Sequence, residues 1–376
     1  MAGRKVLPNE DVAMTSRERV LLTIEHREPD RVPLTFRGYR SHHKALLEHF
    51  GTDDLAVVMR QLGVDGLGQF GFRGIAPTYL EEDGRRRQDT SPPVVFERCD
   101  RLSMKPLRVL ETAAEVGHYH WPEMSWFDFS DLWYDNEEKI AADYAAHRDY
   151  RWPEPDWEND PISAGWSNVL LVLCGLRGYE PFLTDLVLRP RLSQALVSRM
   201  FDFMLEYNCH LLAAADKPLQ IFTIGDDYGT QKGLYVSPEL FRKFFLPGLR
   251  QEFRLGKALG LKVFLHSCGS IREIIPDLIE AGLDVLDPIQ VGAAGMDPEE
   301  LKREFGRDLC FSGAVDVQET MCHGTPDQVR EEVKARLEVL APGGGYILTT
   351  SHIMPAETPL ENIPALFEAA LQYGVY

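Results

Sequence analysis

Eight short apolar segments, separated by longer stretches of helical periodicity, constrain the fold of this chain more than any other feature. Most of them are apolar on both faces, which is typical of strands in a parallel sheet covered by helices. Eight such strands with intervening helices predict an α/β protein with a single (β/α)8 TIM barrel. The predicted strands are residues 32–36, 64–70, 169–174, 219–225, 262–266, 285–286, 309–312 and 346–350.

Three helix starts support alternation of strands and helices. Ser237, Thr325 and Thr358 each precede a proline, which places a hydroxyl at the N-cap and proline at the first helical position. Gln328 and Glu361 stand three residues after the last two caps and predict capping boxes. Each of these starts follows a predicted strand after a short loop, as a βα unit requires.

The chain is predicted to be one domain with two insertions. Residues 1–14 are polar and are expected to form a loose tail, and residues 15–376 to form the barrel domain. A β-hairpin is expected within residues 76–100. Residues 118–166 form a second excursion, whose indole rings either pack it onto the barrel or form a lid over an aromatic ligand. This excursion holds all the tryptophans, at positions 121, 126, 133, 152, 157 and 166.

Composition excludes several classes of partner and location. The chain has 40 Lys and Arg against 58 Asp and Glu, a formal charge of −18, so nucleic acid and anionic membranes are not expected partners. The N-terminus does not resemble a signal peptide, and no apolar run approaches a membrane span. Six cysteines without CxxC spacing fit reduced thiols in a cytoplasmic protein. A homodimer is compatible with the sequence.

Chemically versatile residues follow the predicted strands. The carboxyl ends of barrel strands meet at one face, where active sites lie. Residues at these positions are therefore the candidates for a site. They are Arg37, Gln69, Cys174, Asp226, Asp227, His266, Cys268, Gln290, Asp316 and His352.

The strongest local signal is His266-Ser267-Cys268-Gly269 at the end of one predicted strand. Residues two apart on an extended chain share a face, so the imidazole and the thiol should both face the barrel axis. With His352 as third ligand they would form a zinc site with one open position, although Cys174 or Asp226 could replace His352. The alternative is a packed histidine beside a buried cysteine.

The Asp226-Asp227 pair ends another predicted strand. Adjacent carboxylates on an extended chain point in opposite directions, so only one is expected to face the site. That one would act as general acid or base, or would orient a histidine ligand. The alternative is a capping or ion-paired carboxylate, and the same choice applies to Asp316. Residues 343–345, three glycines, predict a helix-to-strand turn and not a phosphate loop.

At these residues the chain resembles the uroporphyrinogen decarboxylase superfamily, whose fold is a single (β/α)8 barrel. The resemblance extends from Arg17 to Tyr376. It rests on residues 19–21, 28–33, 237–239, 265–269, 287–290, 312–316, 352–355 and 358–362.

The superfamily contains two chemistries, and the chain resembles both in part. The decarboxylases carry an MRQAGRY loop that grips substrate carboxylates, and they lack the HxC pair. Residues 35–40 here read TFRGYR, so the motif is absent although two arginines remain. The zinc methyltransferases have HxC and a distant third ligand, often cysteine. His352 occupies that position here, as in the decarboxylases.

The resemblance implies a zinc-dependent methyltransferase that moves a methyl group between a small molecule and a corrinoid held by a separate protein. A methyl ether, a methylamine and a thiol are the candidate small molecules. Asp226 and Asp227 are then the candidate catalytic residues, and Arg37, Gln69, Gln290 and Asp316 the candidate substrate contacts. Two alternatives are a cofactor-independent decarboxylase, which would use Asp226 or Asp227 with Arg37, and a non-catalytic binder of metal or tetrapyrrole.

Overall fold

The structure is a computed structural model. It describes residues 14–68, 72–87, 95, 105–134 and 156–376. The predicted tail therefore lies almost entirely outside the described residues. Within these ranges, no helix is long and apolar enough to cross a membrane.

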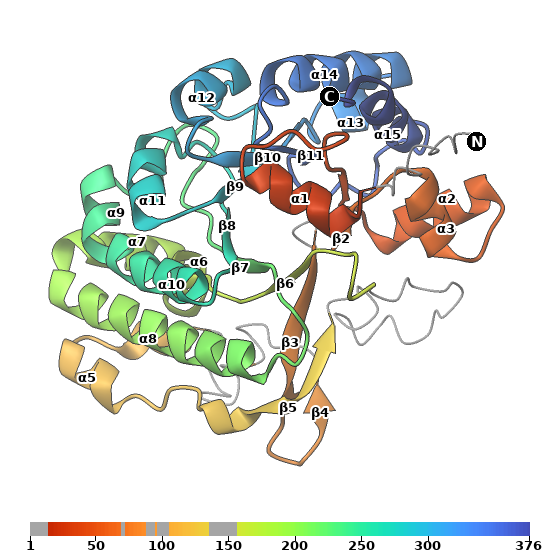
Figure 1. Ribbon diagram of the computed structural model, residues 1–376. Coiled ribbons are helices and arrows are strands. Elements are labelled where there is room, and N and C mark those ends of the chain that lie inside the picture. Colours follow the sequence, from red (N-terminus) through yellow and green to blue (C-terminus); the bar gives the residue numbers. More distant parts are fainter. Residues whose placement is uncertain (1–13, 69–71, 88–94, 96–104, 135–155) are drawn as a thin grey trace, which may run out of the picture.

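Parallel strands with helices around them form the centre of the molecule (Figure 1). Neighbours pair in the order β11, β10, β9, β8, β7 and β6, and two isolated parallel bridges, Leu34–Leu348 and Gly38–Met354, join the segments around β1 and β11. The segment of β2 and β3 lies between β1 and β6, because β2 pairs with β1 and β3 pairs with β6, although β2 and β3 belong to different sheets of the described residues. This arrangement matches the expected TIM-barrel fold, with β2 and β3 together in the place of one barrel strand. Its strands are β1 (Thr35–Phe36), β2 (Gly66–Leu67), β3 (Arg73–Leu80), β6 (Ile162–Ala164), β7 (Ile221–Gly225), β8 (Lys262–His266), β9 (Val285–Ile289), β10 (Cys310–Val315) and β11 (Tyr346–Thr350).

Helices surround the barrel, and α1 covers its amino end (Figure 1). Val20 and Ile24 of α1 pack against the first residues of several strands, among them Ile221 and Val285. The longer helices are α1 (Ser16–Ile24), α2 (Arg40–Phe50), α6 (Val169–Arg177), α7 (Tyr179–Leu188), α8 (Pro190–Ala214), α10 (Leu246–Ala258), α12 (Pro298–Phe305), α14 (Pro326–Leu340) and α15 (Asn362–Tyr373). The shorter ones are α3 (Leu55–Gln61), α5 (Ala113–His118), α9 (Pro238–Phe244), α11 (Ile275–Ala281) and α13 (Thr320–His323).

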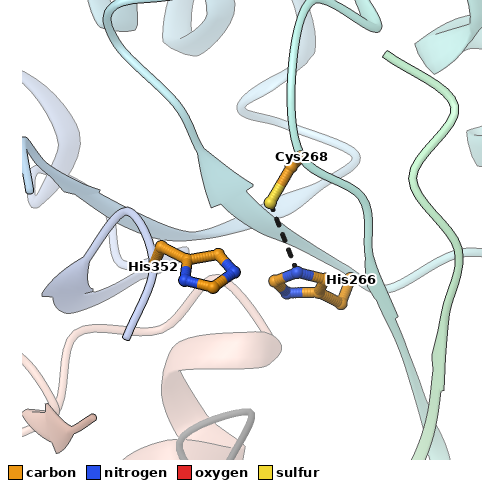
Figure 2. A group of neighbouring side chains, drawn as sticks. All are labelled: His266, Cys268 and His352. Carbon is orange, nitrogen blue, oxygen red and sulfur yellow. Dashed lines mark hydrogen bonds between the residues drawn. The ribbon is translucent and has the colours of Figure 1, made fainter. Parts of the chain in front are cut away.

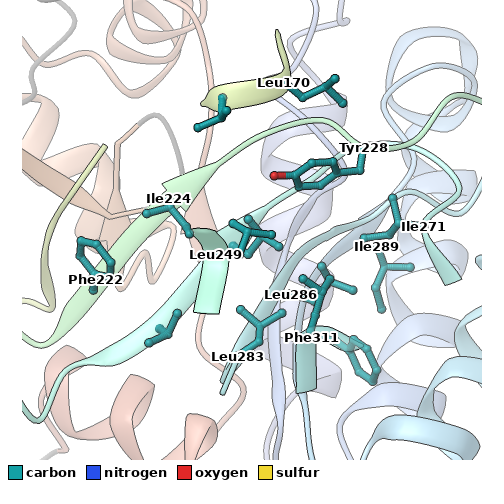
Figure 3. Packing of buried hydrophobic residues seen from close by; sticks show 14 of the residues in the cluster. Leu170, Phe222, Ile224, Tyr228, Leu249, Ile271, Leu283, Leu286, Ile289 and Phe311 are labelled. Carbon is teal, nitrogen blue, oxygen red and sulfur yellow. The ribbon is translucent and has the colours of Figure 1, made fainter. Parts of the chain in front are cut away.

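Apolar side chains between strands and helices hold the strand ends in place (Figure 3). Phe222 and Ile224 of β7, Leu286 of β9 and Phe311 of β10 are all buried with Leu249 of α10. Burial of this kind contributes about 25 cal/mol per Å² of apolar surface. The strands are therefore rigid supports for whatever side chains follow them.

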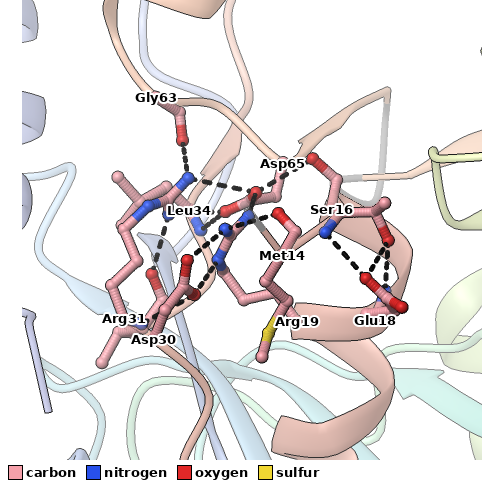
Figure 4. Close-up of polar contacts among 11 residues, drawn as sticks. Met14, Ser16, Glu18, Arg19, Asp30, Arg31, Leu34, Gly63 and Asp65 are labelled. Carbon is pink, nitrogen blue, oxygen red and sulfur yellow. Dashed lines mark hydrogen bonds and ion pairs between the residues drawn. The ribbon is translucent and has the colours of Figure 1, made fainter. Parts of the chain in front are cut away.

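A buried ion-pair network closes the amino end of the barrel (Figure 4). The Asp65 carboxylate accepts hydrogen bonds from Arg19 (2.5 Å), Arg31 (2.7 Å), the Leu34 amide (2.9 Å) and the Ser16 hydroxyl (3.0 Å). Its side chain is only 1% exposed. The network joins α1, the segment before β1 and the segment before β2.

Most strand predictions are confirmed, but one is wrong. Residues 262–266 and 346–350 form strands with the predicted bounds, while residues 169–174 lie in α6. A six-residue apolar run does not distinguish a strand from a buried helix, and Asp226 caps the amino end of this one. The strand between β3 and β7 is β6 instead, and its three residues are too few to show a hydrophobic pattern.

The helix caps at Ser237 and Thr325 are confirmed, the latter with its capping box. The cap at Thr358 is wrong, because α15 begins at Asn362. The side-chain amide of Asn362 donates to the carbonyls of Met321 and Gly324, which fixes the start of the helix at this residue. The glycines at 343–345 form the expected turn between α14 and β11.

The predicted hairpin is present as β3 and β4 (Arg86–Arg87), and β5 (Phe127–Tyr134) pairs with the other side of β3. Trp121 and Trp126 are buried, and Trp157 and Trp166 pack partly buried against the core. These four indoles therefore attach the excursion to the barrel. Trp152 and the side chain of Trp133 lie outside the described part of the chain.

Candidate metal centre

Three of the predicted residues meet at the carboxyl end of the barrel (Figure 2). His266 ends β8, Cys268 follows two residues later, and His352 follows β11. One ligand atom of each lies within 4.8 Å of the others, and Cys268 Sγ is 3.4 Å from His266 Nε2. Ligands of a tetrahedral zinc ion stand about 3.4 to 3.7 Å apart, so small rotations of the His352 side chain would complete a site.

Backbone contacts fix the loop that carries Cys268. Its amide donates to Asp227 Oδ1 at 2.8 Å, and the Gly269 amide donates to Gln290 Oε1 at 2.8 Å. Gly269 has φ of +86°, and a Cβ there would lie 2.5 Å from the carbonyl carbon of Gly229. A side chain at this position would therefore displace the thiol.

A buried carboxylate behind His266 orients its ring. Asp287 Oδ2 lies 2.7 Å from His266 Nδ1, and Arg37 donates to both oxygens of Asp287 at 3.0 and 2.6 Å. Burial alone would raise the pKa of Asp287, but Arg37 and His266 outweigh it and lower that pKa well below its usual range. An ionised Asp287 holds the proton of His266 on Nδ1 and turns Nε2 toward Cys268.

Sequence reasoning missed Asp287 and assigned Arg37 to substrate. The missing signal is the strand register, since Asp287 pairs with His266 across β8 and β9. The Arg37 side chain is 1% exposed, and its guanidinium lies against Asp287 and not at a substrate surface.

The surroundings of Cys268 and His352 favour the uncharged forms of these two side chains. Burial raises the pKa of the Cys268 thiol, and Asp227 and Asp287 raise it further. Burial also lowers the pKa of His352, as do the neighbouring His266 and Arg37. The neutral imidazole of His352 is ready to bind a metal, whereas the thiol of Cys268 would release its proton only when a metal binds its sulfur.

The two adjacent aspartates separate as expected. Asp226 turns away from the site and accepts hydrogen bonds from the amides of Leu170 (2.5 Å) and Leu171 (3.0 Å) at the start of α6. Burial raises the pKa of Asp226 to about 7. Asp227 faces the site, with Oδ1 3.9 Å from His266 Nε2 and a side chain that is 32% exposed. The capping interpretation therefore fits Asp226, and a role in the site is left to Asp227.

The other candidates lie around the centre or away from it. Gln290 holds the Gly269 amide, and Asp316 caps the amides of Gln318 and Glu319 after β10. Cys174 is buried within α6 and does not belong to the metal-binding group. Gln69 lies outside the described residues.

The match of a family model agrees with this geometry. The model described as uroporphyrinogen decarboxylase (URO-D) matches residues 162–373, which is more than half of the chain. The chain belongs to the uroporphyrinogen decarboxylase family. The matched region contains the three candidate ligands, Asp227 and Asp287, while Arg37 lies outside it.

Curated relatives of this family member belong to both chemistries. A methylated-thiol–coenzyme M methyltransferase of Methanosarcina mazei is 26% identical over 48% of this chain and 44% of its own length. A methylcobamide:CoM methyltransferase of Methanosarcina barkeri is 33% identical over 37% of this chain and 38% of its own. A uroporphyrinogen decarboxylase of Psychromonas ingrahamii is 23% identical over 50% and 51%. The chain thus spans about half or less of the length of the curated relatives that it matches.

A solved structure agrees with the fold of the described residues. A methyltransferase from Methanosarcina mazei aligns with 96% of this chain and 99% of its own length, with a TM-score of 0.59 and 18% sequence identity.

Proposed function

We propose that this protein is a zinc-dependent methyltransferase that transfers a methyl group between a small molecule and a corrinoid held by a separate protein. The observation that carries the proposal is the convergence of two imidazoles and one thiol within 4.8 Å at the barrel mouth. Two nitrogens and one sulfur form a donor set that zinc prefers, and three protein ligands leave a position for substrate.

The residues of this chain would divide the work as follows. His266, Cys268 and His352 would hold the ion, which when bound supplies Lewis acidity to a substrate sulfur, oxygen or nitrogen. Asp287 and Arg37 would keep His266 in its binding tautomer. Asp227, partly exposed beside the three ligands, is the group available to substrate.

The decarboxylase alternative is supported by the relatives of that activity, but the position of Arg37 favours methyl transfer. A substrate with many carboxylates needs cations that it can reach. Arg37 is buried against Asp287, and residues 35–40, at the place of the arginine-rich loop, lack its motif. Methyl transfer makes no such demand on the site.

Metal content and turnover of the purified protein test the proposal together. Protein prepared without added metal is expected to contain about one zinc per chain, and to move methyl groups between methylcobalamin and a thiol, as measured by visible absorbance. Replacing His352 with alanine should lower zinc content, whereas His49→Ala, at an exposed position of α2, should not. Turnover of uroporphyrinogen by metal-free protein, without methyl transfer by the zinc form, would contradict the proposal.

A further inference from the structure

We propose that Thr350 positions His352, the third candidate ligand, through a hydrogen bond to the main chain of this histidine. The inference rests on the proposed function and adds a positioning residue to the metal centre. It starts from the different support that the two candidate histidine ligands receive.

His266 is held by its ring, whereas His352 is held by its main chain. Asp287 Oδ2 lies 2.7 Å from His266 Nδ1. His352 is exposed at the barrel mouth, with its ring centroid 6.0 Å from that of His266, and no carboxylate of the described residues forms an ion pair with it (Figure 2). The direction in which this imidazole leaves the chain therefore depends on the backbone of residues 350–354.

Thr350 binds the main chain of His352 directly. It is the last residue of β11, pairs with Val315 of β10 and is 3% exposed. Its Oγ1 donates a hydrogen bond to the His352 carbonyl oxygen at 2.6 Å. Because a β-branched side chain has few χ1 rotamers, the strand fixes the direction of the hydroxyl. The hydroxyl in turn fixes the peptide group that follows the histidine.

Two main-chain hydrogen bonds hold the chain on either side of His352. The Ser351 amide donates to a carbonyl of β10 at 2.7 Å, and the Met354 amide donates to the Arg37 carbonyl at 3.1 Å. These bonds tie the segment to β10 and to the end of β1, but neither involves an atom of the histidine. The Thr350 hydroxyl supplies the bond at the histidine itself. Without it the His352 carbonyl is free to turn between its fixed neighbours.

Thr349 offers a matched control on the same strand. It is 1% exposed, and its hydroxyl donates to the Thr35 carbonyl at 3.0 Å. Valine has nearly the shape of threonine, so Thr349→Val and Thr350→Val each remove one hydrogen bond from a buried hydroxyl to a main-chain carbonyl. Only the second of these bonds ends on a candidate ligand.

Zinc affinity, measured by competition with a chromophoric chelator, separates positioning from stability. We expect Thr350→Val to lower this affinity about tenfold, Thr349→Val to leave it within about twofold, and Thr350→Ser, which keeps the hydroxyl, to retain most of it. Urea unfolding should show similar losses of stability for the two valine variants, since each loses one hydrogen bond. Equal zinc affinities for the two valine variants would overturn the inference.

A double variant shows whether Thr350 acts through His352. In a His352→Ala background, Thr350→Val should change zinc affinity by less than about twofold, because the imidazole that Thr350 positions is absent. The full tenfold loss in this background would contradict the inference, since Thr350 would then act on the metal by another route.

A second pair of variants keeps the test decisive if Thr350→Val does not fold. Thr350→Ser and Thr350→Ala differ by one hydroxyl, so the serine variant should bind zinc about tenfold more tightly than the alanine variant. Equal affinities of these two, with zinc binding and methyl transfer intact in wild type, would reject the role of Thr350 alone. If wild-type protein binds no zinc, the proposed function is wrong and the inference falls with it.

Discussion

Buried arginine–aspartate pairs lie at both ends of the barrel, but only one of them holds a side chain that could bind a ligand. At the amino end the Asp65 carboxylate accepts hydrogen bonds from Arg19, Arg31, the Ser16 hydroxyl and the Leu34 amide (Figure 4). At the carboxyl end the Asp287 carboxylate binds the Arg37 guanidinium and the His266 imidazole, and the other ring nitrogen of His266 faces the barrel mouth. The first arrangement joins segments of the fold, and the second presents a histidine to a ligand. Burial and ion pairing alone therefore do not mark a functional site.

The largest expected effect breaks the carboxyl-end site directly. Cys268→Ala removes the softest candidate ligand, so zinc content should fall to near zero and methyl transfer by several orders of magnitude. The measurement is zinc per chain together with corrinoid methylation, with Cys209→Ala on α8 as an exposed-cysteine control. In a decarboxylase the same change would cost about 1 to 2 kcal/mol of stability and little activity. Retention of zinc and of methyl transfer by Cys268→Ala would reject the proposed mechanism.

The next prediction tests whether the ion pairs at the amino end affect stability alone and not zinc binding. Asp65→Ala leaves two arginines near a vacated carboxylate position and should lower the free energy of unfolding by about 3 to 5 kcal/mol. Urea unfolding measures this loss. The folded fraction should bind zinc with wild-type affinity, because Asp65 contacts none of the candidate ligands. A specific loss of zinc affinity in the folded protein would show that the two ends are coupled.

An intermediate effect tests the positioning of His266. Asp287→Asn keeps the volume of the side chain but removes the charge that holds the histidine tautomer, and zinc affinity should fall about 10- to 100-fold. Competition with a chromophoric chelator gives this affinity. Asp316→Asn is the matched control, since Asp316 also follows a barrel strand but caps backbone amides. Equal zinc affinities for the two variants would show that Asp287 does not position His266.

The smallest effect concerns a buried acid that belongs to neither arginine–aspartate pair. Glu252 of α10 forms no ion pair with any described residue, and burial, with Asp226 nearby, raises its pKa to about 8. An unfolded glutamate ionises near pH 4.3, so between about pH 4.3 and 8 the folded state binds the extra proton. Wild-type stability should therefore fall as pH rises through this range. Glu252→Gln should flatten the decline measured by urea unfolding, and an unchanged slope would place the proton elsewhere.

Much of the site could be predicted from local pattern. The spacing of His266 and Cys268 on an extended chain fixes their common face, and the end of the last strand points to His352. Asp287 and the partition of Asp226 from Asp227 could not be predicted in this way. Asp287 matters because β9 pairs beside β8 in a register that aligns it with His266.

The sequence by itself determined the barrel class and the residues that supply the candidate ligands, because strand periodicity, helix caps and the HxC spacing are local properties of the chain. Only the tertiary structure decided which apolar run is α6 and which short segment is β6, since a buried helix and a buried strand are equally apolar. It also decided that Arg37 forms an ion pair with Asp287. The partner of an arginine depends on which buried carboxylate the packing of distant strands brings within reach.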